Sequence, residues 1–420
     1  MPELDVAHPR NNVPPSIRAM VRGSSLLSTP DHPLAALRSL IVDHFSRPLG
    51  PGGTSLRAFE GELSPVVTVS QNFDELLTPL DHVSRRPSDT FYVDEGRLLR
   101  CHMTAHQTSL LRAGHRAFLM IGDVYRRDTV DATHAPVFHQ VDGVRVWRGE
   151  ELPEPARRAL AAGDRGPAEA LVVEDLKAAL EGLARRLFGA GAELRWVDAH
   201  FPFTSPSLEL EVQWEGKWLE LLGCGVIRSA ILGACGGHGG SSGAESIGWA
   251  FGLGLERLAM VLHAVPDIRL FWSTDPRFLG QFSRDRVAAE AAAGRFVKFE
   301  AFSKHPACFK DLAFWVPKGK AVVSEEDADG EGKLGSGVQG HDDAPVFHEN
   351  DVHAAVREAA GHLVESVQRV DKFVHPKTGR TSLCYRVNYR APDRTLTNAE
   401  VNGVMEKVRQ AVYDLGVELR

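Results

Sequence analysis

Residues 122–147 read GDVYRRDTVDATHAPVFHQVDGVRVW, and this stretch decides the fold. It predicts a strand that ends near Arg126, a polar turn and a return strand, so that the two strands form an antiparallel hairpin. An arginine at the end of such a strand, with hydrogen-bonding side chains on the facing strand, is suited to hold a nucleotide phosphate beside a second substrate. The stretch therefore predicts a phosphate site on an antiparallel sheet.

A second arginine that suits the same chemistry lies far downstream. Arg257 belongs to residues 248–260, GWAFGLGLERLAM, in which two glycines that allow close backbone approach precede apolar residues at helical spacing. Two fixed guanidinium groups could hold the two ends of one triphosphate.

The order of these motifs resembles motifs two and three of the class II aminoacyl-tRNA synthetases, and the finer detail resembles the phenylalanyl-tRNA synthetases, specifically their single-chain organellar form. Four further segments carry the resemblance: LSPVVT (63–68), LLRCHMTAHQ (98–107), FPFTSPSLELEV (201–212) and KFVHPKTGRTSLCYRVNYR (372–390). The FPFT and PSLE tetrapeptides, together with the complete GLGLERLAM, are its most specific part.

The resemblance implies an α+β fold in two parts. The first is a class II synthetase catalytic domain with an antiparallel sheet, and the second is a C-terminal ferredoxin-like α+β anticodon-binding domain. The implied activity is that of a phenylalanine–tRNA ligase, which uses ATP to activate L-phenylalanine as phenylalanyl-adenylate. The phenylalanyl group then passes to the 3′-terminal adenosine of tRNA(Phe) in organellar translation.

Residue patterns favour an α+β fold independently of the resemblance. Leu208, Leu210 and Val212 alternate with polar residues, which predicts a half-buried antiparallel strand, and residues 218–222 are expected to pair with it. Neither a GxxxxGK[ST] loop nor a strand-linked GxGxxG occurs, which disfavours a doubly wound sheet. Helices are expected at 34–45 and 168–188, and a strand at 63–69.

Four parts are expected along the chain: an N-terminal arm over the surface (1–33), the catalytic domain (34–283), a linker (284–294) and the anticodon-binding domain (295–420). Within the catalytic domain we expect a charged loop at 148–164 and a flexible glycine-rich excursion at 223–248, with 233–243 as its core. The acidic insertion at about 318–344 is expected to be disordered, because it cannot bury apolar area.

The last domain shows a strand-rich pattern. Strands are expected near 296–302, 313–316, 364–373 and 381–390, and a helix near 351–363. A final helix should begin after Thr397, which forms a capping box with Glu400.

Composition limits the classes of function. The net charge of −7 and the pI near 6.2 mean that any RNA contact must come from a local basic face. Five scattered cysteines without a CxxC pair indicate a reducing compartment and disfavour a zinc ribbon. No apolar run is long enough to span a bilayer.

The resemblance assigns roles to individual residues. Two are expected to be catalytic: Arg126, on the α-phosphate and the attacking carboxylate, and Arg257, on the γ-phosphate. Phenylalanine-binding residues are expected to be His102, Thr104, Gln140, Glu220, Phe201, Phe203, Ala250 and Phe251. ATP-binding residues are expected to be Arg126, Asp128, Thr133, His134, Phe138 and Arg257. Further substrate contacts are expected from Ala105, His106, Gln107 and Ala135.

The side-chain pocket is the best argument for phenylalanine. Phe201 and Phe203 flank Pro202, so both rings can reach one face of an extended segment, and aromatic packing adds about 0.5 to 1.5 kcal/mol beyond burial. Ala250 would form a small floor beneath the substrate ring. For the ammonium group, Gln140 and Glu220 can accept hydrogen bonds. His102 can equally be a satisfied core residue.

Partners follow from the same resemblance. Residues 366–394 hold seven bases and two acids, and tRNA contacts are expected from Lys372, Lys377, Arg380, Arg386 and Arg390. ATP implies Mg²⁺, whose ligands the spacing does not assign; the role of Asp142 also stays open. We expect a monomer, with no membrane attachment, in the mitochondrial matrix, with a plastid or dual targeting as alternatives.

Two other functions compete with this interpretation. A synthetase-derived RNA-binding or regulatory protein would keep the fold without turnover, although such proteins usually lose a motif arginine or a pocket residue, and Arg126, Arg257 and Glu220 are all present. A class II enzyme for another amino acid would need polar groups where Phe201 and Ala250 lie.

Overall fold

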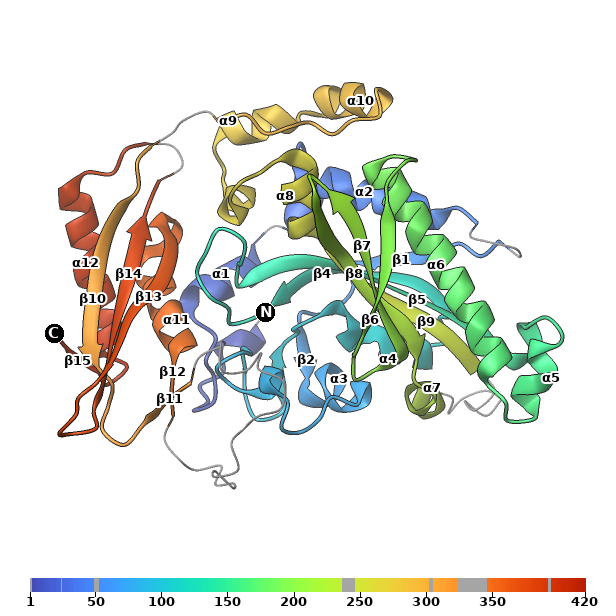
Figure 1. The fold of residues 1–420 in the computed structure, drawn as a ribbon, viewed down its shortest axis with the longest axis horizontal. Coiled ribbons are helices and arrows are strands. Elements are labelled where there is room, and N and C mark those ends of the chain that lie inside the picture. Colours follow the sequence, from blue (N-terminus) through green and yellow to red (C-terminus); the bar gives the residue numbers. More distant parts are fainter. Residues whose placement is uncertain are drawn as a thin grey trace.

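The computed structural model describes residues 2–23, 25–48, 53–235, 246–301, 305–323, 346–391 and 394–420. Its largest feature is a seven-stranded sheet of order β1-β4-β5-β9-β8-β7-β6 (Figure 1). The strands are β1 (Arg57–Glu60), β4 (Ala117–Tyr125), β5 (Val137–Arg148), β6 (Leu194–Ala199), β7 (Thr204–Trp214), β8 (Lys217–Ile227) and β9 (Ser246–Gly254). β1 pairs with β4 in parallel, and the other neighbouring strands as described pair antiparallel, so the antiparallel expectation is confirmed.

The predicted hairpin of 122–147 is formed by β4 and β5. Tyr125 pairs with Val137, and just beyond this pair the Arg126 amide donates to the Pro136 carbonyl at 3.0 Å. Arg126 therefore stands where β4 ends, at the rim of the sheet, and Phe138 faces it from the start of β5.

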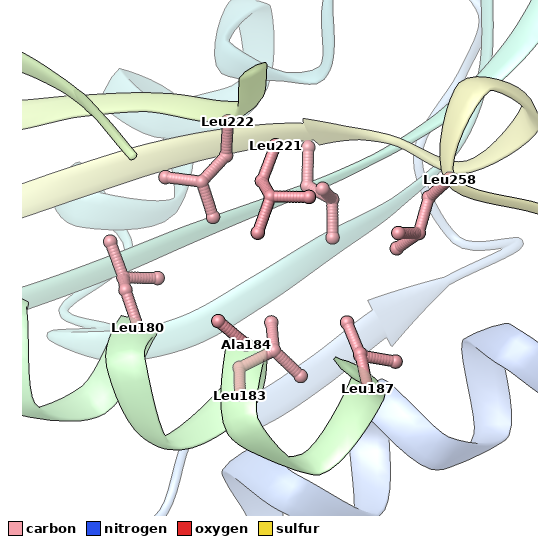
Figure 2. Close-up of a pocket in the computed structure, with 8 residues that line it drawn as sticks. Leu180, Leu183, Ala184, Leu187, Leu221, Leu222 and Leu258 are labelled. Atoms are coloured by element: carbon pink, nitrogen blue, oxygen red, sulfur yellow. The ribbon is translucent and has the colours of Figure 1, made fainter. Parts of the chain in front are cut away.

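Three helices cover one face of this sheet: α2 (Pro33–Ser46), α6 (Gly166–Phe188) and α8 (Leu255–His263). Figure 2 shows leucines of α6, including Leu180 and Leu187, facing Leu222 of β8 and Leu258 of α8, around a void of about 10 Å³. Each fully buried leucine contributes roughly 1.5–3 kcal/mol of hydrophobic free energy. The helices expected at 34–45 and 168–188 are confirmed.

Shorter elements cover the other face. They are β2 (Val66–Thr68), α3 (Val69–Asn72), β3 (Arg97–Leu99), α4 (Gln107–Arg112) and α7 (Ser229–Cys235). Met120 and Val144 of the sheet pack there with Ile231 and Leu232 of α7. This thinner cover leaves room for a cavity on the sheet.

The N-terminal arm is part of the core. It contains α1 (Pro15–Arg22), and Leu4 and Ile17 are buried against Phe91 and Tyr125. The apolar side chains of this arm have partners beneath them, so they anchor the arm to the catalytic domain.

Two expected loops of the catalytic domain contain regular structure. Residues 148–164 include α5 (Ala156–Ala161), whose Ala156 and Leu160 are buried in the same cluster as α6. Within 223–248, the ends belong to β8 and β9 and the middle begins with α7. Residues 236–245 lie outside the described residues.

The second domain has a four-stranded antiparallel sheet of order β13-β14-β10-β15. Its strands are β10 (Cys308–Trp315), β13 (Val364–Val374), β14 (Thr381–Tyr389) and β15 (Glu418–Leu419), with helices α11 (Glu349–Ala360) and α12 (Asn398–Tyr413). This arrangement is ferredoxin-like, as expected. The capping box is confirmed: the Glu400 amide donates to the Thr397 hydroxyl at 3.3 Å.

The join between the domains departs from expectation. Residues 296–301 form no strand; instead Val297 is buried in the catalytic core, where its carbonyl accepts from His263 Nδ1 at 2.7 Å. The 284–294 segment contains a helix, α10 (Arg284–Ala292). The acidic insertion begins later than 318, since β11 (Ala321–Val323) pairs with β12 (Val346–His348); residues 324–345 lie outside the described residues.

The turn of the β4–β5 hairpin lies against α11. Asp351 pairs with Arg127 at 2.9 Å, and His353 Nδ1 accepts from the Val130 amide at 3.2 Å. Arg357 donates to the Asp128 carbonyl at 2.6 Å. The second domain thus holds the polar turn from outside.

Candidate active site

A cavity of about 980 Å³ opens on the sheet face opposite α6. Both arginine motifs and the FPF segment border it. The expected site residues that line it are His102, Thr104, Gln107, Arg126, Asp128, Thr133, His134, Ala135, Phe138, Gln140, Phe201, Phe203, Glu220, Ala250, Phe251 and Arg257. Ala105 and His106 do not line it. His106 is buried beneath, with Nε2 at 3.1 Å from the Arg100 guanidinium.

Buried polar atoms without partners gather at one end of the cavity. The Thr104 hydroxyl donates to Asp142 Oδ2 at 2.6 Å. Among the described residues no partner is found for Asp142 Oδ1, Gln140 Oε1, His102 Nδ1 or the amide group of Gln107. A buried polar group left unpaired costs about 1–3 kcal/mol, so this cluster indicates a site built for a hydrogen-bonding ligand.

Burial sets the charges at this end. Burial raises the pKa of Asp142 to about 6, although the hydrogen bonds from Thr104 and the positive charge of Arg126 act to lower it. Burial, assisted by Arg126, lowers the pKa of His102 to about 3. At neutral pH the site therefore holds one carboxylate and a neutral imidazole, which suits a cationic ligand such as an ammonium group.

The FPF segment forms an aromatic wall. The Phe201 and Phe203 rings are nearly parallel, at 10°, with centroids 6.0 Å apart, and His102 lies 6.4 Å from Phe203. A Cβ on Gly223 would lie 2.6 Å from Phe201 Cζ, so the Phe201 ring occupies the space that this glycine leaves. Ala250 is buried on the same face of the sheet.

Phe251 was expected at the pocket wall or near the adenine. It borders the cavity, but its ring stacks on Phe45 of α2 at 5.1 Å, in the core behind the sheet. Gly143 makes room for this ring, because a Cβ there would come within 2.1 Å of Phe251 Cε1. The side chain of Phe251 therefore supports the sheet from behind.

Arg126 is exposed to the cavity and held at two points. Its Nε donates to the Cys101 carbonyl at 2.9 Å, and its guanidinium lies 5.1 Å above the Phe138 ring. Among the described residues no anionic partner is found for Arg126. A guanidinium oriented in this way is prepared for an anion.

Arg257 stands in the first turn of α8, with 68% of its side chain exposed. Its Nη1 lies 3.4 Å from Glu220 Oε2. Glu220, expected beside the ammonium group, thus makes its contact at the arginine of the third motif. A register shift between Leu210 and Glu211 in the β7–β8 pairing places Glu220 opposite Glu211 and breaks the alternation of side chains along β8.

The turn after Arg126 is ordered by Asp131, whose Oδ1 accepts from the amides of Thr133 at 2.6 Å and His134 at 2.8 Å. Thr133 and His134 are exposed beside the cavity. Asp128 Oδ1 accepts from the Thr129 amide at 2.8 Å, so its carboxylate caps the same turn.

The sequence contains a signal for the place of Asp142 in the site. Gln140 and Asp142 are two residues apart on one strand, so they face the same side of the sheet. Gly223 was missed as well, because the sequence does not show that an aromatic ring crosses it.

The expected tRNA contacts lie on β13, on β14, in the turn between them and, for Arg390, directly after β14. Arg380 pairs with Glu418, Arg386 with Asp311 and Arg390 with Glu365. Lys372 and Lys377 are exposed, and no ion pair is found for either among the described residues. Beside them, Trp315, Phe373 and His375 form a ring cluster.

Neither a membrane span nor a cluster of metal ligands is found within the described ranges. No helix there combines the length and apolar character needed to cross a bilayer. No three His, Cys, Asp or Glu side chains gather there as ligands for a metal ion.

Comparison with known proteins supplies the family. Residues 56–153 and 168–282 match the family described as "tRNA synthetases class II core domain (F)", and residues 344–420 match the "Ferredoxin-fold anticodon binding domain". The chain is 44% identical over 414 residues to the phenylalanine–tRNA ligase, chloroplastic/mitochondrial, of Arabidopsis thaliana, covering 98% of the chain and 83% of that protein. It is 44% identical over 414 residues to the mitochondrial enzyme of Mus musculus (95% and 83% covered), and 36% identical over 450 residues to that of Saccharomyces cerevisiae (93% and 88%).

Proposed function

This chain belongs to the phenylalanine–tRNA ligases of the single-chain organellar type, and from that premise we propose how its own residues carry out the reaction. It is a class II aminoacyl-tRNA ligase, which uses ATP and joins L-phenylalanine to tRNA(Phe). One observation carries the proposal: two exposed guanidinium groups border the same cavity as a cluster of buried acceptors for which the described residues offer no partner.

Phenylalanine binds at the end of the cavity where the acceptors gather. Its ammonium group donates to Gln140 Oε1 and Asp142 Oδ1, which have no partner among the described residues, and the Asp142 carboxylate supplies the opposite charge. Its benzyl group lies against Phe201 and Phe203, over Ala250. This placement gives a partner to Gln140 Oε1 and Asp142 Oδ1 and fills the apolar part of the cavity with the same ligand.

Activation then needs ATP with its α-phosphorus facing the substrate carboxylate. A carboxylate oxygen forms a bond to this phosphorus, the bond to the bridging oxygen of the β-phosphate breaks, and pyrophosphate leaves with the electron pair. Arg126 binds the α-phosphate and the carboxylate, and Arg257 holds the γ-phosphate. Because Arg126 is already fixed by Cys101 and Phe138, little reorganisation is needed as charge shifts.

Mg²⁺ fits this cavity through a carboxylate and the nucleotide. The ion usually takes one or two carboxylates together with substrate phosphates and water, so a dedicated protein cage is not required. Glu220, which borders the cavity beside Arg257, is the residue that would hold it. When bound, Mg²⁺ neutralises the negative charge of the phosphates.

The second domain binds tRNA(Phe) through β13 and β14. Lys372 and Lys377 supply positive charge for the phosphate backbone, and the ring cluster of Trp315, Phe373 and His375 offers faces for bases. The paired arginines of this face, Arg380, Arg386 and Arg390, contribute by exchanging a carboxylate for a phosphate.

We further propose that the protein is a monomer and that it acts in an organelle. The mitochondrial matrix is the compartment that we propose first. The animal and yeast relatives above are named mitochondrial, and the plant relative chloroplastic/mitochondrial.

Charging of a phenylalanine tRNA tests the proposal. The purified protein should attach phenylalanine to an organellar tRNA(Phe) transcript, and Arg257→Ala should lower this rate by orders of magnitude. Wild-type protein that activates no phenylalanine would overturn the proposed use of the cavity.

A further inference from the structure

A buried pair of polar residues, His139 and Glu256, lies directly behind the nucleotide end of the cavity. His139 of β5 is 1% exposed and Glu256 of α8 is 2% exposed. Glu256 Oε1 lies 2.6 Å from His139 Nδ1, and Glu256 Oε2 accepts from the His139 backbone amide at 2.8 Å. Both carboxylate oxygens are therefore bound by one residue on another element.

The position of this pair explains its double contact. The β5–β9 ladder ends at the pair Gln140–Gly254, and the chain then turns into α8. The next β5 amide, that of His139, would lose its partner there. The Glu256 carboxylate takes the place of the missing strand, so it joins the first turn of α8 to β5.

The pair also connects the substrate-facing residues of the two motifs. His139 lies between Phe138 and Gln140, whose side chains face the cavity, and Glu256 directly precedes Arg257. The His139 ring stacks on Trp272 at 6.0 Å, at an angle of 27°. A shift of Glu256 would therefore change the distance between Arg257 and the site that Phe138 and Arg126 form.

We infer that Glu256 is a positioning residue for adenylate formation: through His139 it fixes the separation between the two arginines that hold ATP. The inference rests on the proposed function. Adenylate formation depends on this separation, because a misplacement of about 1 Å far from the reacting atoms can cost about 100-fold in rate. His139 does not line the cavity, and both carboxylate oxygens of Glu256, which borders the cavity beside Arg257, are bound by His139. The effect of the pair should therefore fall on ATP and spare phenylalanine binding.

The test uses changes on both sides of the pair. Glu256→Asp keeps the charge but is one methylene too short to reach both donors, and His139→Leu removes the ring donor. In ATP–pyrophosphate exchange we expect the kcat of each to fall about tenfold or more and the KM for ATP to rise about fivefold, with the KM for phenylalanine within about twofold of wild type.

Two controls make the result specific. His139→Asn places an amide nitrogen where Nδ1 was, so it should donate to Glu256 and keep exchange within about threefold of wild type. Asp175→Asn removes the carboxylate of another pair on β5, Arg145–Asp175 at 2.7 Å, far along the strand from the arginines. It should lower the melting temperature without the selective rise in the KM for ATP.

Several results would overturn the inference. They are Glu256→Asp with exchange within about threefold of wild type, a KM for phenylalanine that rises together with that for ATP, or the same kinetic split in Asp175→Asn. If Glu256→Asp and His139→Leu both fail to fold, the pair is a folding element and the inference is rejected. An inactive wild-type protein would instead refute the proposed function, so the two failures are distinguishable.

Discussion

The Thr104 hydroxyl donates a 2.6 Å hydrogen bond to Asp142 Oδ2, and no partner for the second oxygen of this carboxylate is found among the described residues. One oxygen of Asp142 is therefore oriented by the protein, while the other is available to a ligand. With Gln140 two residues before it, Asp142 forms the polar end of the cavity.

Removing the charge of Asp142 should weaken phenylalanine binding selectively. In Asp142→Asn, the ammonium group loses a charged acceptor, and we expect the KM for phenylalanine to rise about 10- to 100-fold. The KM for ATP should change little. Exchange kinetics with each substrate varied in turn measure both values, and equal rises in the two would contradict the assignment.

The raised pKa of Asp142 gives two linked pH effects. Because its pKa is about 6, against 3.8 ordinarily, the free enzyme should lose kcat/KM for phenylalanine as the pH falls through about 6. The folded state binds this proton more tightly than the unfolded state, so stability falls as the pH rises from 3.8 to about 6 and the loss persists above it. Asp142→Asn should therefore melt no lower than wild type at pH 7.5 without substrates. A profile of kcat/KM that is flat from pH 5 to 8 would refute the assignment, with Asp142→Asn as the control for other titrating groups.

Gly223 should be needed for the aromatic wall. A methyl group in Gly223→Ala would lie 2.6 Å from Phe201 Cζ, so the ring must move into the cavity. We expect the KM for phenylalanine to rise about tenfold, from the cost of about 1–3 kcal/mol for overpacking. Gly233→Ala on α7 is the matched control, since no atom lies within 4 Å of a Cβ there. Equal behaviour of the two variants would remove Gly223 from the account.

The exposed lysines of the second domain should act on tRNA alone. Lys372→Ala combined with Lys377→Ala should raise the KM for tRNA and lower the slope of log K against log salt by about 1.4 to 1.8, for the loss of two phosphate contacts. Exchange without tRNA should stay at the wild-type rate. Lys407→Ala, an exposed lysine on α12, serves as the control. An unchanged salt slope in the double variant would place the RNA elsewhere.

Much of the fold could be predicted because local patterns agree with it. The β4–β5 hairpin, the α6 helix and the Thr397 capping box each depend on residues close together in sequence. The expected strand near 296–302 is not formed by the described residues 296–301, for a tertiary reason: apolar residues such as Val297 pack on α8 at His263.

The site could be predicted less completely than the fold, because the sheet face to which a side chain points depends on the register of the strand pairing. Along β9, Phe251 points to the face of the sheet that packs in the core, whereas its neighbour Ala250 points to the opposite face. The general tendency of aromatic residues to line pockets does not reveal which face an aromatic side chain takes. Glu220 lies next to a register shift in the β7–β8 pairing, so a strict alternation of side chains along β8 does not predict the face on which it lies. The Glu256–His139 pair joins residues 117 positions apart, and no local pattern reports such a contact.

The central claim is that Arg126 and Arg257 hold opposite ends of one ATP beside the Phe201–Phe203 wall. A crystal structure with phenylalanine and a non-hydrolysable ATP analogue tests it most directly. The account predicts guanidinium nitrogens of Arg126 within about 3.2 Å of an α-phosphate oxygen, and of Arg257 within about 3.2 Å of a γ-phosphate oxygen. Either guanidinium turned to bulk solvent, or the aromatic slot filled by the protein's own side chains with both ligands bound, would contradict it.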